Sequence, residues 1–309
     1  SNRGLLPKYG FPVDVVELQI LHHAEEAKRL QLERDLRIAL SEYAPGSQIV
    51  AAGRLWTSRY IKKVTKKEWP RYKYMICMQC QHYDRILTAD AQDGDFTECP
   101  KCQSTDVHKG TFLMPEFGFV VDSEMPGKPG DARPERTYST RVYFSGIAQE
   151  EQRVQLPLKN SLVIQATPAT HGKLAIINSG RQNTGFKVCS SCGFAMMQTE
   201  KSRKSHMTPY QKSCSGKLHN RISLGHEFET DVLKLQIEGV SNTDQGFWFS
   251  LLYALLEGAS EELQIERQDL DGCLYSIGKL DNFSLILFDD VPGGAGRVRQ
   301  MANANNLKS

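Results

Sequence analysis

The sequence predicts an α+β fold in which a mixed β-sheet core packs with helices and carries two small zinc-binding lobes. Short β-rich runs, apolar helical patterns in the first and last thirds, and two cysteine groups at metal-ligand spacing support this prediction. At 309 residues and 40% hydrophobic composition, the chain is long enough to bury a substantial core. We expect five segments: an N-terminal helix and β-hairpin segment at 1–73, a zinc ribbon at 74–109, a β-rich segment at 110–186, a second zinc motif at 187–221 and an α+β part at 222–309.

Charge and hydropathy restrict the classes of partner. The formal net charge is only +2, so binding to nucleic acid has to come from a local patch. No run approaches the roughly 18 apolar residues of a membrane span, and the start lacks a secretory signal, which predicts a cytoplasmic protein without a membrane partner. The Ser-Asn start in place of Met predicts an excised piece of a longer protein.

The first third predicts a helix followed by a hairpin. Within 14–46, the second half has apolar residues at helical spacing, with Leu36, Ala39 and Leu40 on one face, and a Pro-Gly stop at 45–46. The next stretch, to about residue 64, alternates and turns at Gly53, which predicts a β-hairpin.

Similar patterns predict the remaining elements. Residues 110–186 contain short β-rich runs separated by Gly and Pro, and the C-terminal part predicts a strand at 224–239, an apolar helix at 246–263, strands at 270–278 and 284–290 and a short helix at 296–305. A phrase at 7–14 recurs at 115–122, which indicates either paired structural elements or two similar turns.

The first cysteine group has the spacing of a zinc ribbon. Cys77 and Cys80 form one Cys-x2-Cys turn, and Cys99 and Cys102 form a second turn 18 residues later. Four thiolates fill a tetrahedral site, so we expect this zinc to fold a lobe rather than to catalyse a reaction. A redox Cys-x2-Cys pair is the alternative.

The second group is less complete. Cys189, Cys192 and Cys214 supply three ligands, and we favour His206 as the fourth because it lies between the two halves of the motif. His219 and Cys273 are the alternatives, although Cys273 has the surroundings of a buried core thiol. The sequence therefore predicts two zinc ions per chain.

Residues 54–74 combine cations and aromatic rings, the composition of a surface for single-stranded DNA. The candidate binding residues are Trp56, Arg59, Tyr60, Lys62, Lys63, Lys66, Lys67, Trp69, Arg71 and Tyr72. A solvated hairpin edge is the alternative interpretation. A second basic set, from Lys201 to Arg221, surrounds the other zinc motif and favours nucleic acid as the partner.

Signals for catalysis are weak. The Pro-Gly-Gly-Ala-Gly turn at 292–296 has the form of a phosphate-binding loop, but a structural turn is the favoured interpretation. Asp231, Asp289 and Asp290 would form a metal-dependent nuclease centre if the fold brought them together. The sequence contains no nucleophile elbow, zincin motif or helicase motor motif.

Several phrases resemble a known family, among them LLPKYGFPVDVVEL, HMTPYQKSCSG, LGHEFETDVLKL, SLLYALLEGASEEL and LFDDVPGGAG. They are similar to the C-terminal accessory domain of MrfA-like superfamily 2 helicases, which also occurs in the DrmB protein of the DISARM anti-phage system. The resemblance implies a non-motor module attached to, or partnered with, an ATP-dependent DNA helicase in DNA repair or anti-phage defence. The family's further cysteine-rich segment has no counterpart before Ser309, so none of its metal ligands is carried over.

The favoured hypothesis is therefore a zinc-stabilised accessory domain that binds DNA, with the helicase motor in cis or in trans. The chain is not expected to be catalytic alone. Two alternatives stay open: a protein-interaction scaffold that docks a motor or partner subunit, and a cryptic metal-dependent nuclease.

Overall fold

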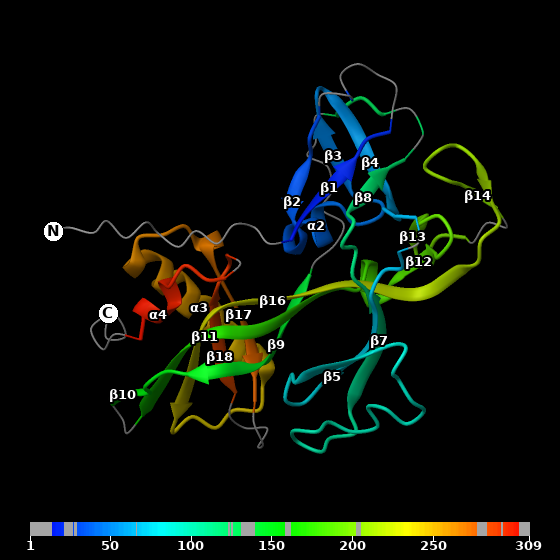
Figure 1. Cartoon of the computed structure of the whole chain (residues 1–309). Helices are drawn as coiled ribbons and strands as arrows, with labels where there is room; N and C mark the ends of the chain where they lie inside the picture. Colours follow the sequence, from blue (N-terminus) through cyan, green and yellow to red (C-terminus); the bar gives the residue numbers. More distant parts are fainter. Residues whose placement is uncertain are drawn as a thin grey trace.

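The computed structural model describes residues 14–21, 27, 30–65, 67–122, 124, 126–130, 140–157, 162–201, 205–276, 283–291 and 293–302. Strands predominate in this part of the chain (Figure 1), so the fold is mostly β rather than an even mixture of helices and strands. The helices with described bounds are α2 (Leu36–Glu42), α3 (Gln245–Leu263) and α4 (Arg297–Gln300).

A five-stranded sheet forms the N-terminal part, with the strand order β2-β1-β8-β4-β3. Its strands are β1 (Val15–Gln19), β2 (Glu33–Asp35), β3 (Gln48–Ala51), β4 (Arg54–Ile61) and β8 (Phe119–Val121). The β1–β8 pair is parallel, and the others are antiparallel. The hairpin predicted to turn at Gly53 is confirmed as β3–β4, where Ala52 and Gly53 both have positive φ, as a two-residue turn requires.

An eleven-stranded mixed sheet forms most of the remainder. Its strands are β5 (Arg71–Cys77), β6 (Tyr83–Leu87), β7 (Val107–Leu113), β9 (Arg141–Glu150), β10 (Val154–Pro157), β11 (Val163–Asn178), β12 (Phe186–Cys189), β13 (Ala195–Met197), β16 (Leu218–Glu238), β17 (Leu270–Tyr275) and β18 (Ser284–Asp289). The long β16 is its axis, because it pairs with β11, β12 and β18 antiparallel and with β7 parallel. Figure 1 shows β16 running from the α3 side to the far tip of the molecule.

The strand β11 is longer than the sequence indicated, because two expected short runs join into one strand of 16 residues. The ladder to β16 shifts between Ala169 and Gly172, and His171 has a φ of 56° at this bulge. A Cβ at Gly172 would lie 2.2 Å from a methyl of Val232. Gly172 therefore marks a close approach of β11 to β16 within a continuous strand, not a break.

The predicted C-terminal helix is confirmed as α3, which packs on the sheet through Trp248, Leu252, Leu256 and Ala259. These residues recur at helical spacing, and the Asp244 side chain caps the start by accepting from the Gly246 amide at 2.8 Å. No helix in the described ranges is long and apolar enough to cross a membrane.

The expected helix after residue 30 is shorter than predicted, since Glu33–Asp35 form an edge strand and α2 begins at Leu36. Of the repeated phrase, the first copy lies almost wholly outside the described residues. The second forms the turn into β8, where Gly118 has a φ of 86° and donates to the Pro115 carbonyl at 2.9 Å. A Cβ at Gly118 would lie 2.3 Å from the Glu17 carbonyl oxygen, so this glycine permits β1 and β8 to pair.

We therefore expect Gly118→Ala to lower the free energy of unfolding by about 2–4 kcal/mol, from the left-handed backbone and the clash with β1. Urea denaturation followed by tryptophan fluorescence measures this change. Gly130→Ala is the matched control, because a Cβ there has nothing within 4 Å and no positive φ. Equal stability of the two variants would contradict this account of the β1–β8 joint.

Candidate functional site

The four cysteines of the first predicted site meet at the end of the β5–β7 lobe. Two turns deliver them with the same backbone pattern: the Gln81 amide donates to the Cys77 carbonyl, and the Gln103 amide donates to the Cys99 carbonyl. Both turns need a residue with positive φ after the second cysteine, Gln81 and Gln103. The sequence therefore builds two equivalent knuckles that aim their sulfur atoms at one point.

The geometry of this cluster fits a tetrahedral metal site. All four sulfur atoms lie within 4.8 Å of one another. The Cys77–Cys102 and Cys80–Cys99 Sγ–Sγ distances are 3.5 and 3.6 Å, near the edge of about 3.8 Å that Zn–S bonds of about 2.3 Å imply. These distances exclude disulfides, and the cysteines are free.

The small core around this cluster consists largely of its own ligands. Met75, Cys77, Cys80 and Cys99 are buried together, with Phe96 and Val107 packed against them. Burial raises the pKa of the Cys77 and Cys80 thiols, so without a metal both stay protonated. A bound cation would displace these protons and join the two knuckles.

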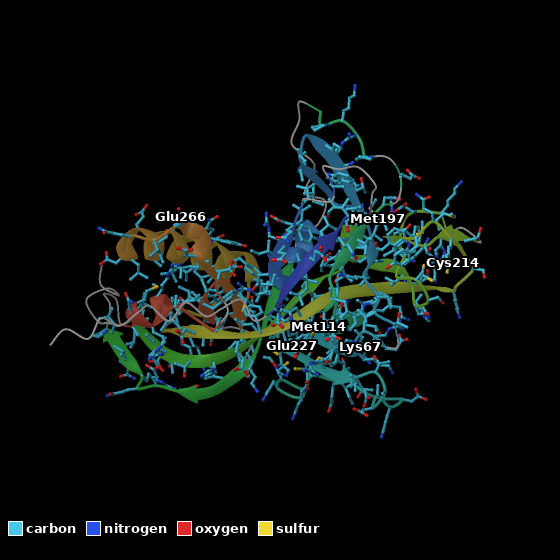
Figure 2. All side chains as sticks on the ribbon, turned by 45° about the horizontal axis from the view of Figure 1, so that its top comes forward. Lys67, Met114, Met197, Cys214, Glu227 and Glu266 are labelled. Carbon is cyan, nitrogen blue, oxygen red and sulfur yellow. The ribbon has the colours of Figure 1, made fainter. Side chains whose placement is uncertain are left out.

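The second cluster brings together Cys189, Cys192, His206 and Cys214, again within 4.8 Å of one another. Cys189 ends β12, and the hairpin of β14 (His206–Met207) and β15 (Ser213–Cys214) pairs His206 directly with Cys214. The Cys192 Sγ to His206 Nε2 distance is 3.1 Å, and the Cys189–Cys214 Sγ–Sγ distance is 4.0 Å. Figure 2 places Cys214 at the tip of the molecule, remote from Glu266 after α3.

The structure resolves which residue accompanies the three cysteines. His206 is buried and its ring stacks on Phe194, with a centroid distance of 4.6 Å. His219 lies on β16 opposite Val188 of β12, and Cys273 lies in the main core. Neither residue belongs to the cluster. Each of the two clusters therefore has four side chains that could hold a metal ion.

The pKa values of two thiols in the second cluster are shifted in opposite directions. A hydrogen bond from Cys192 lowers the pKa of Cys189 to about 4, while the same contact and burial raise the pKa of Cys192. One thiolate is therefore already favoured at neutral pH, which suits a cation.

The basic and aromatic stretch does not form the predicted stacking surface. The exposed fractions of Trp56, Tyr60 and Trp69 are 1%, 1% and 3%, so the prediction that these three rings stack on bases is wrong. Each ring is fixed inside the protein; Trp56 Nε1 donates to the Ala51 carbonyl, and Trp69 Nε1 donates to the Lys62 carbonyl.

Part of this stretch supports the second cluster instead. Tyr60 packs edge-on against Phe194, next to the Cys192 knuckle, and its hydroxyl donates to the Met207 carbonyl at 3.2 Å. Lys63 donates to the Ser190 carbonyl inside the knuckle, and the Ile61 amide donates to the Gly193 carbonyl. The aromatic residues that look like a ligand surface in the sequence therefore position a metal lobe.

Three cations of the stretch form ion pairs within the protein. Arg59 pairs with Asp122 at 3.1 Å, Lys62 with Glu17 at 3.2 Å and Lys63 with Glu68 at 3.0 Å. The ring of Tyr72 stacks on Phe112, and the Arg85 guanidinium lies 4.2 Å from its centroid. Among the described residues, Lys67 and Arg71 form no ion pair. Lys66 lies outside the described residues.

The acidic residues proposed for a nuclease centre are engaged in the fold. The fully buried Asp289 accepts from the backbone amides of Ala295, Arg297 and Val298 at 2.7, 3.0 and 2.9 Å. Asp231 accepts from the Gly296 amide at 2.9 Å, and Asp290 pairs with Arg37 at 2.8 Å. These amides of the glycine turn thus face carboxylates of the protein itself rather than a phosphate, so the turn is structural.

No carboxylate cluster with metal-ligand geometry occurs in the part of the chain that the structure describes. The two cysteine clusters offer four protein ligands each, which leaves no open position for a substrate. An ion held in either cluster would therefore have a structural role.

Comparisons with known proteins give a distant relative and no family assignment. No protein-family profile matches the chain. It is 26% identical over 352 aligned positions to the Druantia protein DruE of Escherichia coli strain UMEA 4076-1, an alignment that covers 98% of this chain and 18% of that protein. The chain thus spans about a fifth of the length of this relative.

Two solved structures are similar to the chain. The crystal structure of the DUF1998 helicase MrfA bound to DNA aligns with a TM-score of 0.35 at 11% identity, over 92% of this chain and 27% of MrfA. The structure of MrfA with DNA and AMPPNP aligns with a TM-score of 0.30 at 10% identity, over 93% and 25%.

The structural role of Asp289 predicts a large loss of stability. Asp289→Ala leaves three backbone amides without this acceptor, one of them buried and two part-buried, and we expect it to lower the free energy of unfolding by about 2–4 kcal/mol. Asp93→Ala removes an exposed carboxylate and should change it by less than about 0.5 kcal/mol. Chemical denaturation compares the two, and a fully stable Asp289→Ala protein would show that the turn does not depend on this carboxylate.

Proposed function

We propose that this chain is a zinc-stabilised, DNA-binding accessory domain of, or partner to, an ATP-dependent DNA helicase in DNA repair or anti-phage defence. The pair of closed four-ligand clusters carries this proposal, because such sites fix the shape of small lobes and leave chemistry to another component. We place the protein in the cytoplasm with no membrane partner.

Zinc is the cation that suits both donor sets. Thiolate and imidazole donors in tetrahedral arrangement are typical of structural zinc, whereas calcium and magnesium prefer oxygen ligands. Cys77, Cys80, Cys99 and Cys102 would hold one ion in a zinc ribbon, and Cys189, Cys192, His206 and Cys214 would hold the other. When bound, each ion would supply a cross-link and no catalytic step.

The helicase context rests on sequence. The phrases resembling the C-terminal accessory domain of MrfA-like helicases and DrmB extend over most of the chain, and the alignment with DruE spans nearly all of it. The chain is much shorter than this relative, which fits one module of a larger machine. A motor would then act in cis or in trans.

A protein-interaction scaffold is the second candidate. The observation that favours it is a set of exposed aromatic side chains on α3, where Phe247, Phe249 and Tyr253 have exposed fractions of 39%, 37% and 56%. A scaffold would co-purify with a helicase motor without binding DNA.

The metal assignment is tested by counting zinc in the purified protein with native mass spectrometry. We expect two zinc ions per chain in the wild type and one in His206→Ala. His219→Ala and Cys273→Ala are controls that should keep two, because neither side chain belongs to a cluster. Retention of both ions by His206→Ala would remove this residue from the ligand set.

DNA binding is tested by fluorescence anisotropy with labelled single- and double-stranded oligonucleotides, with and without Mg²⁺. We expect preferential binding of the single strand, weakened by salt, with no cleavage in Mg²⁺. No binding together with co-purification of a helicase motor would favour the scaffold. Cleavage that depends on Mg²⁺ would show an enzyme that the described residues do not reveal.

A further inference from the structure

We propose that a continuous groove between the first metal cluster and the face of the large sheet binds a single strand of nucleic acid. The groove runs from α3 to the start of β16. This inference rests on the proposed DNA-binding function and names its site, which shares only Lys73 and Tyr74 with the basic stretch at 54–74.

Three adjoining cavities form the groove. One of about 880 Å³ lies between α2, β9, β17 and α3, and one of about 710 Å³ lies between β5, β7, the loop before β12 and the start of β16. A small cavity of about 130 Å³ joins them. It shares Met78 and Arg141 with the first cavity and His108 and Asn183 with the second. The knuckle of the first metal cluster, which includes Met78, therefore forms one wall of the groove.

Five cations line this groove. One of them, Arg37, pairs with Asp35 and Asp290. The other four form no ion pair with another described residue: Lys73, Lys109, Arg141 and Arg221. Lys73 pairs with Thr111, and Met75 pairs with Lys109, so the register places both lysines on one face of the β5–β7 pair. In the basic stretch, by contrast, Arg59, Lys62 and Lys63 are paired with acidic side chains. The charges of the groove are therefore available to neutralise phosphates.

Arg221 is held at the groove by a strained backbone. Its φ is 56°, and its amide donates to the Gln198 side chain at 3.0 Å. Gly185 makes this possible, because a Cβ there would lie 2.8 Å from the Arg221 carbonyl carbon. A left-handed, non-glycine residue held by its neighbours is a recurrent feature of binding sites.

Hydroxyl groups line the groove beside these cations. The Tyr74 hydroxyl lies 3.3 Å from Ser223 Oγ, which lies 3.2 Å from Ser179 Oγ, and all three residues line the second cavity. Gly110 lets the Tyr74 ring cross β7, since a Cβ there would lie 2.6 Å from that ring. Tyr74 and Ser223 are buried, so these mutually bonded hydroxyls fix the shape of the groove wall.

The α3 end offers rings for base stacking. Phe249 and Tyr253 lie one turn apart on α3, both line the first cavity, and both are exposed. Aromatic rings stack on bases only where the bases are unpaired, so this end favours a single strand over a duplex.

The charges that line the middle part of the groove favour the binding of a polyanion there. The joining cavity is lined by His108 and Arg141, and its described lining contains no acidic residue. At the α3 end, Glu42 pairs with Arg34, and Asp290 pairs with Arg37. The remaining acids, Asp271 at that end and Asp93 and Asp95 at the other, would repel phosphates and limit the bound length to the groove between them.

The test compares two triple variants in anisotropy titrations with a fluorescent oligothymidylate of ~15 nucleotides and the matching oligouridylate. The groove variant is Lys73→Gln, Lys109→Gln and Arg221→Gln. The control variant is Lys128→Gln, Arg153→Gln and Lys173→Gln, which removes the same charge from exposed cations outside the groove and outside both basic sets. Circular dichroism and zinc content confirm that both are folded.

The groove variant should bind at least about tenfold more weakly, and the slope of log affinity against log salt should fall by about 2, since each lost phosphate contact contributes about 0.7. The control should bind as the wild type. Tyr253→Ala should weaken binding about tenfold without changing the salt slope, because stacking releases no counterions. The ratio of the two oligonucleotide affinities distinguishes DNA from RNA.

The two levels of the proposal fail in different ways. A wild type that binds neither oligonucleotide overturns the DNA-binding function and the groove together. A wild type that binds, with the groove variant unchanged, overturns the groove alone. Tighter binding of duplex than of single strands also overturns the groove.

Discussion

The convergence of two sets of four ligand side chains is the constraint on which the outer parts of this fold depend. The end of the β5–β7 lobe that carries the first cluster has a core of a few residues, most of them cysteines, and the hairpin at the tip of β16 has two-residue strands. Neither region buries enough apolar surface to fold alone, because small lobes cannot offset the conformational entropy of their own chain. A cation bound at each cluster would supply the missing cross-link.

The rest of the molecule is arranged around these two points. The central strand β16 starts four residues after Cys214, runs along the large sheet and ends beneath α3. The first cluster is tied to the core where the Ser276 amide donates to the Cys80 carbonyl at 2.9 Å. Because the knuckle of that cluster also forms a wall of the groove, metal binding and strand binding would be coupled.

Much of the architecture could be predicted from local patterns. The hairpin turn at Gly53, the helix α3 and the two cysteine clusters depend on residues close in sequence, and ligand spacing alone favours His206 over its rivals. The expected balance of helix and sheet is wrong, since Glu33–Asp35 form an edge strand within a stretch of helical pattern, and β11 continues through a bulge that looks like a break. Both errors come from tertiary pairing, which single-sequence propensity does not contain.

Composition alone does not predict which aromatic rings are exposed for binding. Tyr60 and Trp69 stand among lysines, and only the fold reveals that both rings are buried, with Tyr60 against Phe194 beside the second cluster. The unpaired cations of the groove come from β5, β7, β9 and β16, and Lys73 and Arg221 are 148 positions apart in the sequence. No contiguous sequence motif therefore predicts that they line one groove.

The central claim, that these clusters hold zinc as structural cross-links, is tested most directly by X-ray absorption at the zinc edge of the purified protein. The account predicts a total of seven sulfur ligands and one nitrogen ligand for the two zinc ions, with Zn–S distances of about 2.3 Å. A folded protein without zinc, or a shell dominated by oxygen, would contradict it.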